Sequence, residues 1–380
     1  MLKKIPTSSL DFSKKQVYLF MLKDEFPSLH QGIYLNTPAS GLLSRGLLAW
    51  RRQHDQEYLE QGSAFRAHQE EIDLIGQCKN AVSSLFKGDM DRTYIVPNFS
   101  LAFTTLLDCI SKDQKFLYLE GEYPSISYPI ESRQLQALKL SPETALDGSL
   151  EAALKEYKPH VLVFSIVQYT SGLRIDLDLI KQIRQQYPEL LIIADGTQFC
   201  GTEEFDFSSS GIDVLISSGY KWMLAGYGNG FVMLSKQGEA RLQARFSSLN
   251  KPQLPHLKDK TTIGLSLEPG HQDTLAVGSL KYAAEWLISQ DYPRLCATLH
   301  TLRTQAFESL SERGLLPAYI TTRHQPSCIF SLPVLPGLEQ GLQKAGIVYV
   351  QRAGRIRVGF HIYNTAADLE TLLRVIDAHR

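Results

Sequence analysis

The 380-residue chain lacks the features that mark disulfide-rich, metal-binding and membrane proteins. Its five cysteines include no CxxC pair, which argues against a disulfide framework or a zinc site and suits a reducing compartment. Its ten histidines show no HExxH or similar spacing, so we expect no metal ion. No apolar stretch is long enough to span a bilayer, and the basic start lacks the apolar core of a signal peptide. We therefore expect a cytoplasmic protein that does not contact membranes.

An excess of charge of either sign is also missing. The chain has 39 Lys and Arg against 40 Asp and Glu, so no overall field favours nucleic acid or an anionic membrane. Hydrophobic residues make up 43% of the chain and charged residues 21%, which is ordinary for a soluble globular protein. A small molecule is therefore the expected partner.

Short apolar runs alternate with amphipathic stretches between residues 90 and 235. This alternation predicts a three-layer α/β/α fold, in which helices cover both faces of a mainly parallel sheet. The expected strands are 93–97, 115–121, 160–167, 190–195, 214–218 and 230–235, with later ones at 327–334 and 355–360. The expected helices are 44–61, 67–86, 176–187, 275–289 and 292–314.

A second, smaller domain is expected after the sheet. Residues 250–262 are poor in apolar side chains and contain two prolines, which indicates a passage between domains. We expect a large domain at 20–250 and a smaller α+β domain formed by 1–19 and 251–380.

Asp195 follows an uninterrupted apolar run, 190–194. The carboxyl end of a strand in a parallel sheet is where ligands bind. A buried carboxylate there is costly unless a cation meets it, and the pyridinium nitrogen of pyridoxal phosphate (PLP) would be such a cation. The alternative is that Asp195 only caps the turn that follows.

Lys221 stands just beyond the next expected strand, in the sequence Gly219-Tyr220-Lys221. Among aromatic and small residues its amine can lose solvent, which lowers its pKa and favours an imine with an aldehyde. Most loop lysines are merely solvated, but the conjunction with Asp195 and Gln198 favours the reactive interpretation.

A phosphate site is expected where the strand 93–97 ends. Asn98 and Ser100 are good helix-capping residues before an apolar helix, and a helix start binds phosphate. An ordinary helix cap would look the same. Ser218 and Tyr220 could add donors to the same phosphate. The GxGxG sequence at 226–230 is not a dinucleotide loop, because a strand rather than a helix follows it.

Two segments together resemble a known family. Asp195-Gly196-Thr197-Gln198 followed by Ser218-Gly219-Tyr220-Lys221 is similar to the class V aminotransferases, fold-type-I PLP enzymes that include cysteine desulfurases, kynureninases and isopenicillin-N-epimerase-like proteins. The resemblance extends from IYLNTPASGLLS (33–44) through NFSLAFTTLL (98–107) to GRIRVGFHIYNTAADLE (354–370). It implies that PLP is held as a Schiff base on Lys221, with Asp195 beneath the pyridine ring.

The resemblance also implies roles for further residues. Tyr123 would stack on the cofactor, and Gln198 would bond its phenolic oxygen, which Gln168 or Tyr169 also approaches. Arg357 would grip the substrate carboxylate with its planar fork, although alone it could be one end of a surface ion pair. The other residues implied are Phe99 and Ser100 at the phosphate, where the usual Gly-Thr-Thr is replaced by Asn98-Phe99-Ser100, and Asn36, Ala39 and Ser40 beside the substrate.

The family is dimeric, with active sites at the subunit interface. His271 lies where a residue, usually threonine, reaches the phosphate of the neighbouring subunit. We therefore expect a homodimer with shared active sites.

A nucleophilic cysteine is missing before Arg357. Cysteine desulfurases carry one on a loop there, but residues 336–356 contain none. Cys328 lies in an apolar strand pattern, which is typical of a core residue. Persulfide chemistry is therefore not expected, although direct release of sulfur from a small substrate remains open.

The expected function is an aminotransferase that acts at the α-carbon of an amino acid, with Lys221 moving protons there. A lyase, a racemase or an epimerase of the same family remains open. A non-catalytic relative would be expected to have lost Lys221 or Asp195. A nicotinamide oxidoreductase would need a glycine-rich turn after its first strand, which the sequence lacks.

Overall fold

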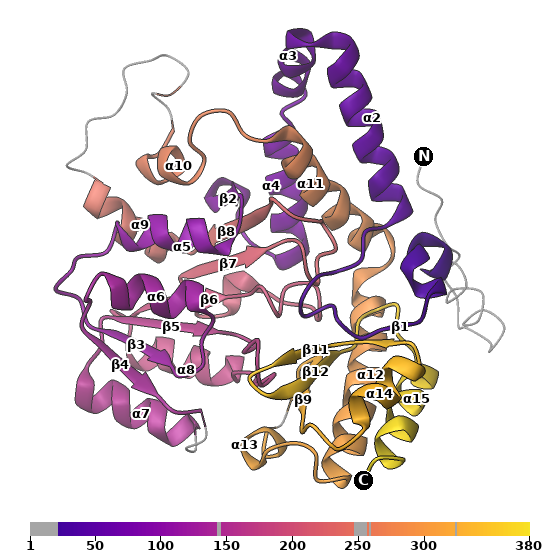
Figure 1. Cartoon of the computed structure of the whole chain (residues 1–380). Coiled ribbons are helices and arrows are strands. Elements are labelled where there is room, and N and C mark those ends of the chain that lie inside the picture. Colours follow the sequence, from indigo (N-terminus) through magenta and orange to yellow (C-terminus); the bar gives the residue numbers. More distant parts are fainter. Residues whose placement is uncertain (1–21, 143–145, 247–256, 258–259, 324) are drawn as a thin grey trace.

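The computed structural model describes residues 22–142, 146–246, 257, 260–323 and 325–380. A seven-stranded sheet lies at its centre, with the strand order β2-β8-β7-β6-β5-β3-β4 (Figure 1). Strand β8 is antiparallel to both of its neighbours, and all other pairs are parallel. The strands are β2 (Thr93–Val96), β3 (Phe116–Leu119), β4 (Ala137–Leu140), β5 (Val161–Ser165), β6 (Leu191–Asp195), β7 (Val214–Ser218) and β8 (Gly230–Leu234). The predicted mainly parallel sheet is confirmed, and each of its six predicted runs forms a strand.

Two helical layers cover the sheet because successive strand residues point to opposite faces. In β5, Leu162 and Phe164 belong to one buried cluster, whereas Val161 and Val163 belong to the other. The first cluster is completed by α4 (Leu74–Phe86), α7 (Leu146–Tyr157), α8 (Leu177–Gln186) and α11 (Thr274–Ser289). The second is completed by α5 (Phe99–Leu107), α6 (Pro124–Ser132), α9 (Lys236–Phe246) and α10 (Thr262–Leu267). The fold is the predicted three-layer α/β/α arrangement.

The helical prediction for 67–86 was wrong in one respect. Helix α2 (Arg45–Gln61) forms as expected, but two helices follow it, α3 (Ser63–Glu71) and α4. They are separated at Asp73, whose φ of 50° is left-handed and whose side chain accepts a hydrogen bond from the Gly76 amide at 3.1 Å. An aspartate that caps a new helix in this way ends the continuous pattern.

The C-terminal part carries two small sheets. One is antiparallel, with the order β11-β12-β9, and the other is the parallel pair β1-β10. Their bounds are β1 (Ile33–Tyr34), β9 (Ile329–Leu332), β10 (Ile347–Val348), β11 (Val350–Arg352) and β12 (Arg355–Gly359). The accompanying helices are α12 (Tyr292–Glu312), α13 (Ala318–Thr321), α14 (Leu338–Lys344) and α15 (Ala366–Asp377), and the short 3-10 helices are η1 (Pro27–His30), η2 (Met90–Arg92) and η3 (Phe207–Ser209). The expected domain boundary near 250 and the segment 1–19 lie outside the described residues, so the domain division stays a prediction.

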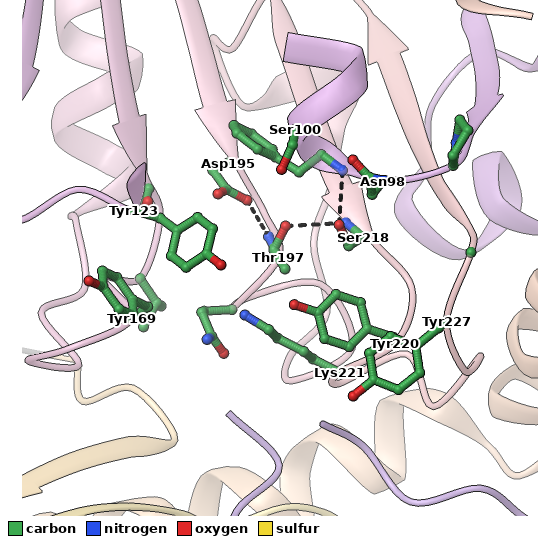
Figure 2. Close-up of a pocket in the computed structure, with 16 residues that line it drawn as sticks. Asn98, Ser100, Tyr123, Tyr169, Asp195, Thr197, Ser218, Tyr220, Lys221 and Tyr227 are labelled. Carbon is green, nitrogen blue, oxygen red and sulfur yellow. Dashed lines mark hydrogen bonds between the residues drawn. The ribbon is translucent and has the colours of Figure 1, made fainter. Parts of the chain in front are cut away.

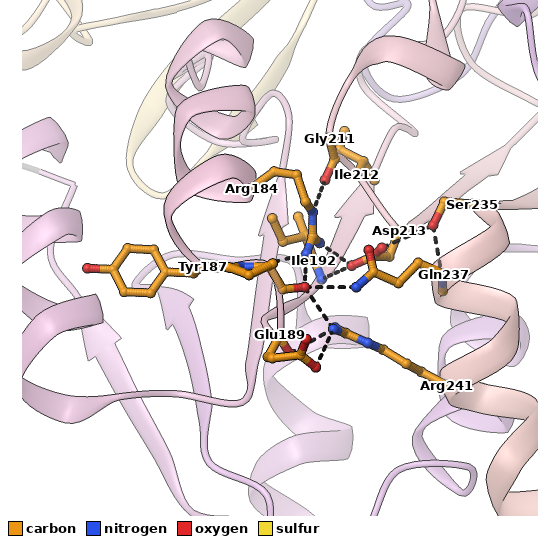
Figure 3. Close-up of polar contacts among 12 residues, drawn as sticks. Arg184, Tyr187, Glu189, Ile192, Gly211, Ile212, Asp213, Ser235, Gln237 and Arg241 are labelled. Atoms are coloured by element: carbon orange, nitrogen blue, oxygen red, sulfur yellow. Dashed lines mark hydrogen bonds and ion pairs between the residues drawn. The ribbon is translucent and has the colours of Figure 1, made fainter.

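A buried polar cluster ties together the amino ends of β6 and β7 (Figure 3). Asp213 is 2% exposed and accepts hydrogen bonds from the Ile192 amide at 2.9 Å, from the Ser235 hydroxyl at 3.0 Å and from the Arg184 guanidinium. Arg184 also donates to the carbonyl of Gly211 at 3.1 Å. Asp195 and Ser218 lie at the other, carboxyl ends of β6 and β7. The cluster therefore holds in place the two strands that carry these residues.

We expect Asp213→Ala to lower the free energy of unfolding by about 3 to 5 kcal/mol, because it removes the carboxylate that faces the half-buried guanidinium of Arg184 and leaves the buried Ile192 amide without its acceptor. Glu189→Gln is the control: its carboxylate pairs with Arg241 in the same cluster but is 91% exposed, so the loss should stay within about 1 kcal/mol. Urea denaturation compares the two variants. Equal losses would contradict the assigned role of Asp213.

Candidate active site

A cavity of about 260 Å³ opens at the carboxyl ends of β5, β6 and β7. The start of α5 and the loop after β7 complete its wall (Figure 2). Nine of the residues predicted for the site line this cavity: Phe99, Ser100, Tyr123, Tyr169, Asp195, Gln198, Ser218, Tyr220 and Lys221. Residues far apart in the sequence are therefore brought together where a parallel sheet binds its ligands.

Asp195 ends strand β6 and is 7% exposed. Its Oδ1 accepts a hydrogen bond from the Thr197 amide at 2.8 Å. Burial raises the pKa of Asp195, although the bonds from Thr197 and the charge of Lys221 oppose the shift. Within the described part of the chain Asp195 forms no ion pair, so a cationic ligand atom in the cavity would relieve its burial.

Lys221 lies in the loop after β7, with 7% of its surface exposed. Its pKa is lowered to about 8: burial is the main cause, the charge of Asp195 opposes it, and the positive charges of Arg357 and Arg352 add to it. A lysine with this pKa has a substantial neutral fraction near pH 8, which is what a nucleophilic or basic amine needs.

The turn 36–41 supports the loop that carries Lys221. The Gly41 amide donates to the carbonyl of Tyr220 at 2.8 Å, and a Cβ atom on Gly41 would lie only 2.1 Å from the carbonyl oxygen of Lys221. Only glycine permits this approach. The carbonyl of Pro38 in the same turn accepts from Nε2 of Gln198 at 2.9 Å, and this nitrogen makes no second hydrogen bond among the described residues.

The start of helix α5 forms one end of the cavity. Asn98 caps the helix, and its Oδ1 accepts from the Leu101 amide at 2.9 Å. The Phe99 amide donates to the Ser218 hydroxyl at 2.9 Å, and the Ser218 amide donates to the Thr197 hydroxyl at 3.2 Å (Figure 2). The Ser100 amide has no acceptor among the described residues. A free amide and a serine hydroxyl at a helix start suit a phosphate group.

Four tyrosines line the cavity. The rings of Tyr123 and Tyr169 meet edge to face at 5.0 Å, and those of Tyr220 and Tyr227 stack at 4.8 Å. Nζ of Lys221 lies 5.9 Å from the centre of the Tyr123 ring and 5.4 Å from that of Tyr220. The amine thus stands among aromatic faces, an environment that suits a planar ring.

Gln168 and Tyr169, the two candidates for contact with the cofactor or the substrate, are placed differently. Gln168 is 1% exposed, and its Nε2 donates to the Glu120 carbonyl at 2.9 Å, whereas Tyr169 lines the cavity. Gln168 is not among the lining residues. Of the two, only Tyr169 lines the cavity, and its contact with a cofactor or substrate stays a prediction.

Arg357 lies beside the cavity rather than in its lining. It is 2% exposed, its Nη1 donates to the Tyr169 carbonyl, and its Nε has no partner among the described residues. Burial, followed by the charge of Arg352, lowers its pKa to about 10. A buried guanidinium with an unused donor suits an anionic ligand.

The other residues predicted for the substrate and the partner subunit also lie outside the lining. The carbonyl of Asn36 accepts from the amides of Ala39 and Ser40, and the Oδ1 of Asn36 is buried without a partner among the described residues. His271 is exposed. Its contact with the phosphate of a second subunit stays a prediction.

The sequence did not single out Glu122, Ser165 or Tyr227. Glu122 is 6% exposed and accepts from the amide of Ser165 at 2.9 Å and from its hydroxyl, which fixes the end of β5 beside Asp195. Burial raises the pKa of Glu122 to about 7, against the bonds from Ser165. In the sequence, Glu122 is distinguished only by being an acidic residue directly before Tyr123.

A family model described as aminotransferase class V matches residues 33–372 of the chain. The chain belongs to the class V aminotransferase family, and the resemblance seen in the sequence is confirmed. The cofactor of this family is PLP.

Similar proteins agree with this family. The uncharacterized aminotransferase YcbU of Bacillus subtilis (strain 168) is 20% identical over 362 residues, 93% of this chain and 96% of that protein. A solved lysine-to-alanine mutant of C-DES, with glycine covalently linked to its PLP cofactor, has a TM-score of 0.79 at 18% identity and covers 93% of this chain and 99% of its own. The apo cysteine desulfurase from Thermococcus onnurineus NA1 has a TM-score of 0.78 at 16% identity over 98% and 99% of the two chains. The fold is that of fold-type-I PLP enzymes.

The cavity contains the groups that PLP requires. Among the described residues, Asp195 is a buried carboxylate without an ion pair, Lys221 is a buried lysine of lowered pKa, and the Ser100 amide at the start of α5 has no acceptor. These three groups suit the ring nitrogen, the aldehyde and the phosphate of PLP. Among the described residues no cluster of three or more His, Cys, Asp or Glu side chains is placed to hold a metal ion. Over the same residues, no helix is both long and apolar enough to cross a membrane.

Proposed function

We propose that the protein is a PLP-dependent aminotransferase that acts on the α-amino group of an amino acid. The observation that carries this proposal is Lys221, a buried amine with a pKa of about 8 in the same cavity as the unpaired carboxylate of Asp195. When bound, PLP supplies an electron-accepting ring that stabilises negative charge at the α-carbon of an amino acid.

The residues of the cavity divide the work. Lys221 would hold the cofactor through its Nζ and, once released by the substrate amine, would take the proton from the α-carbon of the substrate and deliver it to the cofactor carbon. Asp195 binds the ring nitrogen and keeps it protonated, and Tyr123 packs against the ring. The start of α5 and Ser218 bind the phosphate.

Substrate orientation is assigned to Arg357. Its unused Nε and its planar fork suit the α-carboxylate of an amino acid. The turn at Asn36, whose Oδ1 also lacks a partner among the described residues, borders the substrate.

The thiols of the chain support a transferase over a cysteine desulfurase. All five cysteines are buried. Burial raises the pKa of Cys328 to about 11 and that of Cys296 to about 12, and it also raises the pKa of Cys78 and Cys200. None of the five lines the cavity. A persulfide mechanism needs an accessible thiolate, which these positions disfavour.

A carbon–sulfur lyase is the second candidate. One similar solved structure is a complex of the cystine C-S lyase C-DES with its reaction product, cysteine persulfide. In this chain no cysteine is among the residues that line the cavity. Such a lyase would use the same Lys221 amine at the α-carbon but would release the substituent on the β-carbon.

Single-turnover reactions with a panel of amino acids test this proposal. An aminotransferase is expected to convert the bound cofactor to its amine form and release one equivalent of keto acid, because the proton taken by Lys221 is returned to the cofactor carbon. Cysteine and cystine belong in the panel, since a lyase would release pyruvate and ammonia from both, together with sulfide from cysteine or cysteine persulfide from cystine. If no amino acid produced the amine form, the aminotransferase assignment would be wrong.

The homodimer and the cytoplasmic location remain part of this proposal. In a dimer His271 would reach the phosphate of the neighbouring subunit. Mixed dimers of one His271→Ala subunit and one Lys221→Ala subunit test this. If the sites are shared, one site of such a dimer lacks both residues and the other site keeps both. Sedimentation of the purified protein as a monomer would overturn the shared site.

A further inference from the structure

The antiparallel sheet β11-β12-β9 has one apolar and one cationic face. Ile356 and Val358 of β12 are fully buried in the core. Arg355 and Arg357 alternate with them along the strand and point the other way. The strand pairing places Arg352 of β11 directly opposite Arg355 and diagonally across from Arg357, two residues along the strands. Three arginines therefore share a face of this sheet, and Arg357 on that face reaches the Tyr169 carbonyl at the cavity.

Among the described residues, Arg355 is the one arginine of the three that makes several hydrogen bonds within the fold. It donates to the carbonyl of Ser331 at 2.7 Å and to the hydroxyl of Ser331 at 3.1 Å. Arg352 is exposed, and within the described part of the chain its one hydrogen bond goes to the neighbouring Gln351 carbonyl at 3.3 Å. Neither Arg352 nor Arg357 forms an ion pair with an acidic side chain in the described ranges.

Arg352 lies close enough to act on the catalytic groups. Its charge is among the causes that lower the pKa of both Lys221 and Arg357. Like charges held together without an anion are unfavourable, and a ligand that carries negative charge relieves them. An α-carboxylate on Arg357 offsets one of these charges and leaves that of Arg352.

We propose that Arg352 binds a second anionic group on the substrate, so that the preferred substrates are amino acids with a side-chain carboxylate. The two guanidinium groups on one sheet face then bind the two ends of a dicarboxylic substrate whose amino group meets Lys221. This inference rests on the proposed function for the identity of the reacting amine, but the pair of anion sites can be tested separately.

Binding of unreactive carboxylates isolates the two arginines. Glutarate has two carboxylates, butyrate has one, and neither carries an amine. By calorimetry on the holoenzyme, Arg352→Gln is expected to weaken glutarate binding roughly tenfold to a hundredfold and to leave butyrate binding unchanged. Arg357→Gln should weaken both. Arg352→Lys keeps the charge and should retain part of the glutarate preference.

Catalysis provides the second readout. The wild-type protein is expected to prefer glutamate over glutamine, or aspartate over asparagine, and Arg352→Gln should lower that kcat/KM ratio roughly tenfold or more. Lys344→Gln is the matched control, because it removes an exposed charge from α14, the helix whose Glu339 accepts from Gln351 on the other face of β11. Cystine also carries a second carboxylate. A preference for cystine would therefore support the second anion site and would show that its ligand is a disulfide substrate.

The two proposals fail in different ways. Equal binding of glutarate and butyrate, or an Arg352→Gln variant with unchanged binding and substrate ratios, would overturn the role of Arg352 and leave the aminotransferase intact. Glutarate binding that depends on Arg352, without a reaction from any amino acid, would support the anion site and refute the aminotransferase.

Discussion

Replacing Lys221 with alanine is expected to abolish covalent attachment of PLP and to lower turnover by at least about 10³-fold, because one buried amine both holds the cofactor and moves the proton at the α-carbon. The variant should still bind PLP reversibly, since Asp195 and the start of α5 are untouched. The checks are the visible absorbance of the purified protein and single-turnover rates.

Lys236→Ala is the matched control for this variant, because Lys236 is exposed at the start of α9. It should keep both attachment and turnover. A Lys221→Ala protein that retained the covalent cofactor would contradict the assignment.

The pH dependence of attachment tests the physical reason for choosing Lys221. Only the neutral amine attacks an aldehyde, and the pKa of Lys221 is lowered to about 8. Attachment of PLP to the cofactor-free protein should therefore accelerate as the pH rises through about 8 and then level off. For a solvated lysine the rise would continue toward a pKa of about 10.4.

Asp195→Asn is expected to lower kcat/KM by about 10²- to 10³-fold. The amide keeps the size of the side chain and an oxygen that can accept from the Thr197 amide, but it cannot offset a positive charge on the ring nitrogen. The proton on that nitrogen, and with it the electron demand of the ring, is then lost. Steady-state kinetics at saturating PLP measure the effect.

Asp178→Asn serves as the control for the charge change. Its carboxylate lies in the first turn of α8, is 74% exposed and pairs only with Lys181 among the described residues, so activity should not change. An Asp195→Asn enzyme with wild-type kcat/KM and wild-type PLP affinity would show that Asp195 is only a cap for the following turn.

The central strands were predictable because they are buried on both faces. Strands β5 to β8 bury every residue, which leaves an uninterrupted apolar run in the sequence. Edge strand β4 was not predicted, because residues 137–140 are partly or largely exposed and do not form such a run. The break between α3 and α4 was also hidden, since nothing in the apolar spacing reveals a left-handed backbone at Asp73.

The site was predictable where a residue ends a strand or begins a helix. Asp195, Ser218 and Asn98 follow directly from those positions. The orientation of loop residues could not be predicted from the sequence. The Gly172 amide donates to the Gln168 carbonyl in a turn that directs the Gln168 side chain inward. Tyr169, the next residue, lines the cavity. The approach of Arg352 to Lys221 depends on strand pairing in a distant sheet, which the sequence does not specify.

The most direct test of the account is to locate the bond between protein and cofactor. The PLP-loaded protein is reduced with borohydride, digested and mapped by mass spectrometry. The added mass of the reduced cofactor is expected on the peptide that contains Lys221 and on no other lysine peptide. Modification of a different lysine, or an unmodified Lys221 in protein that is saturated with PLP, would contradict it.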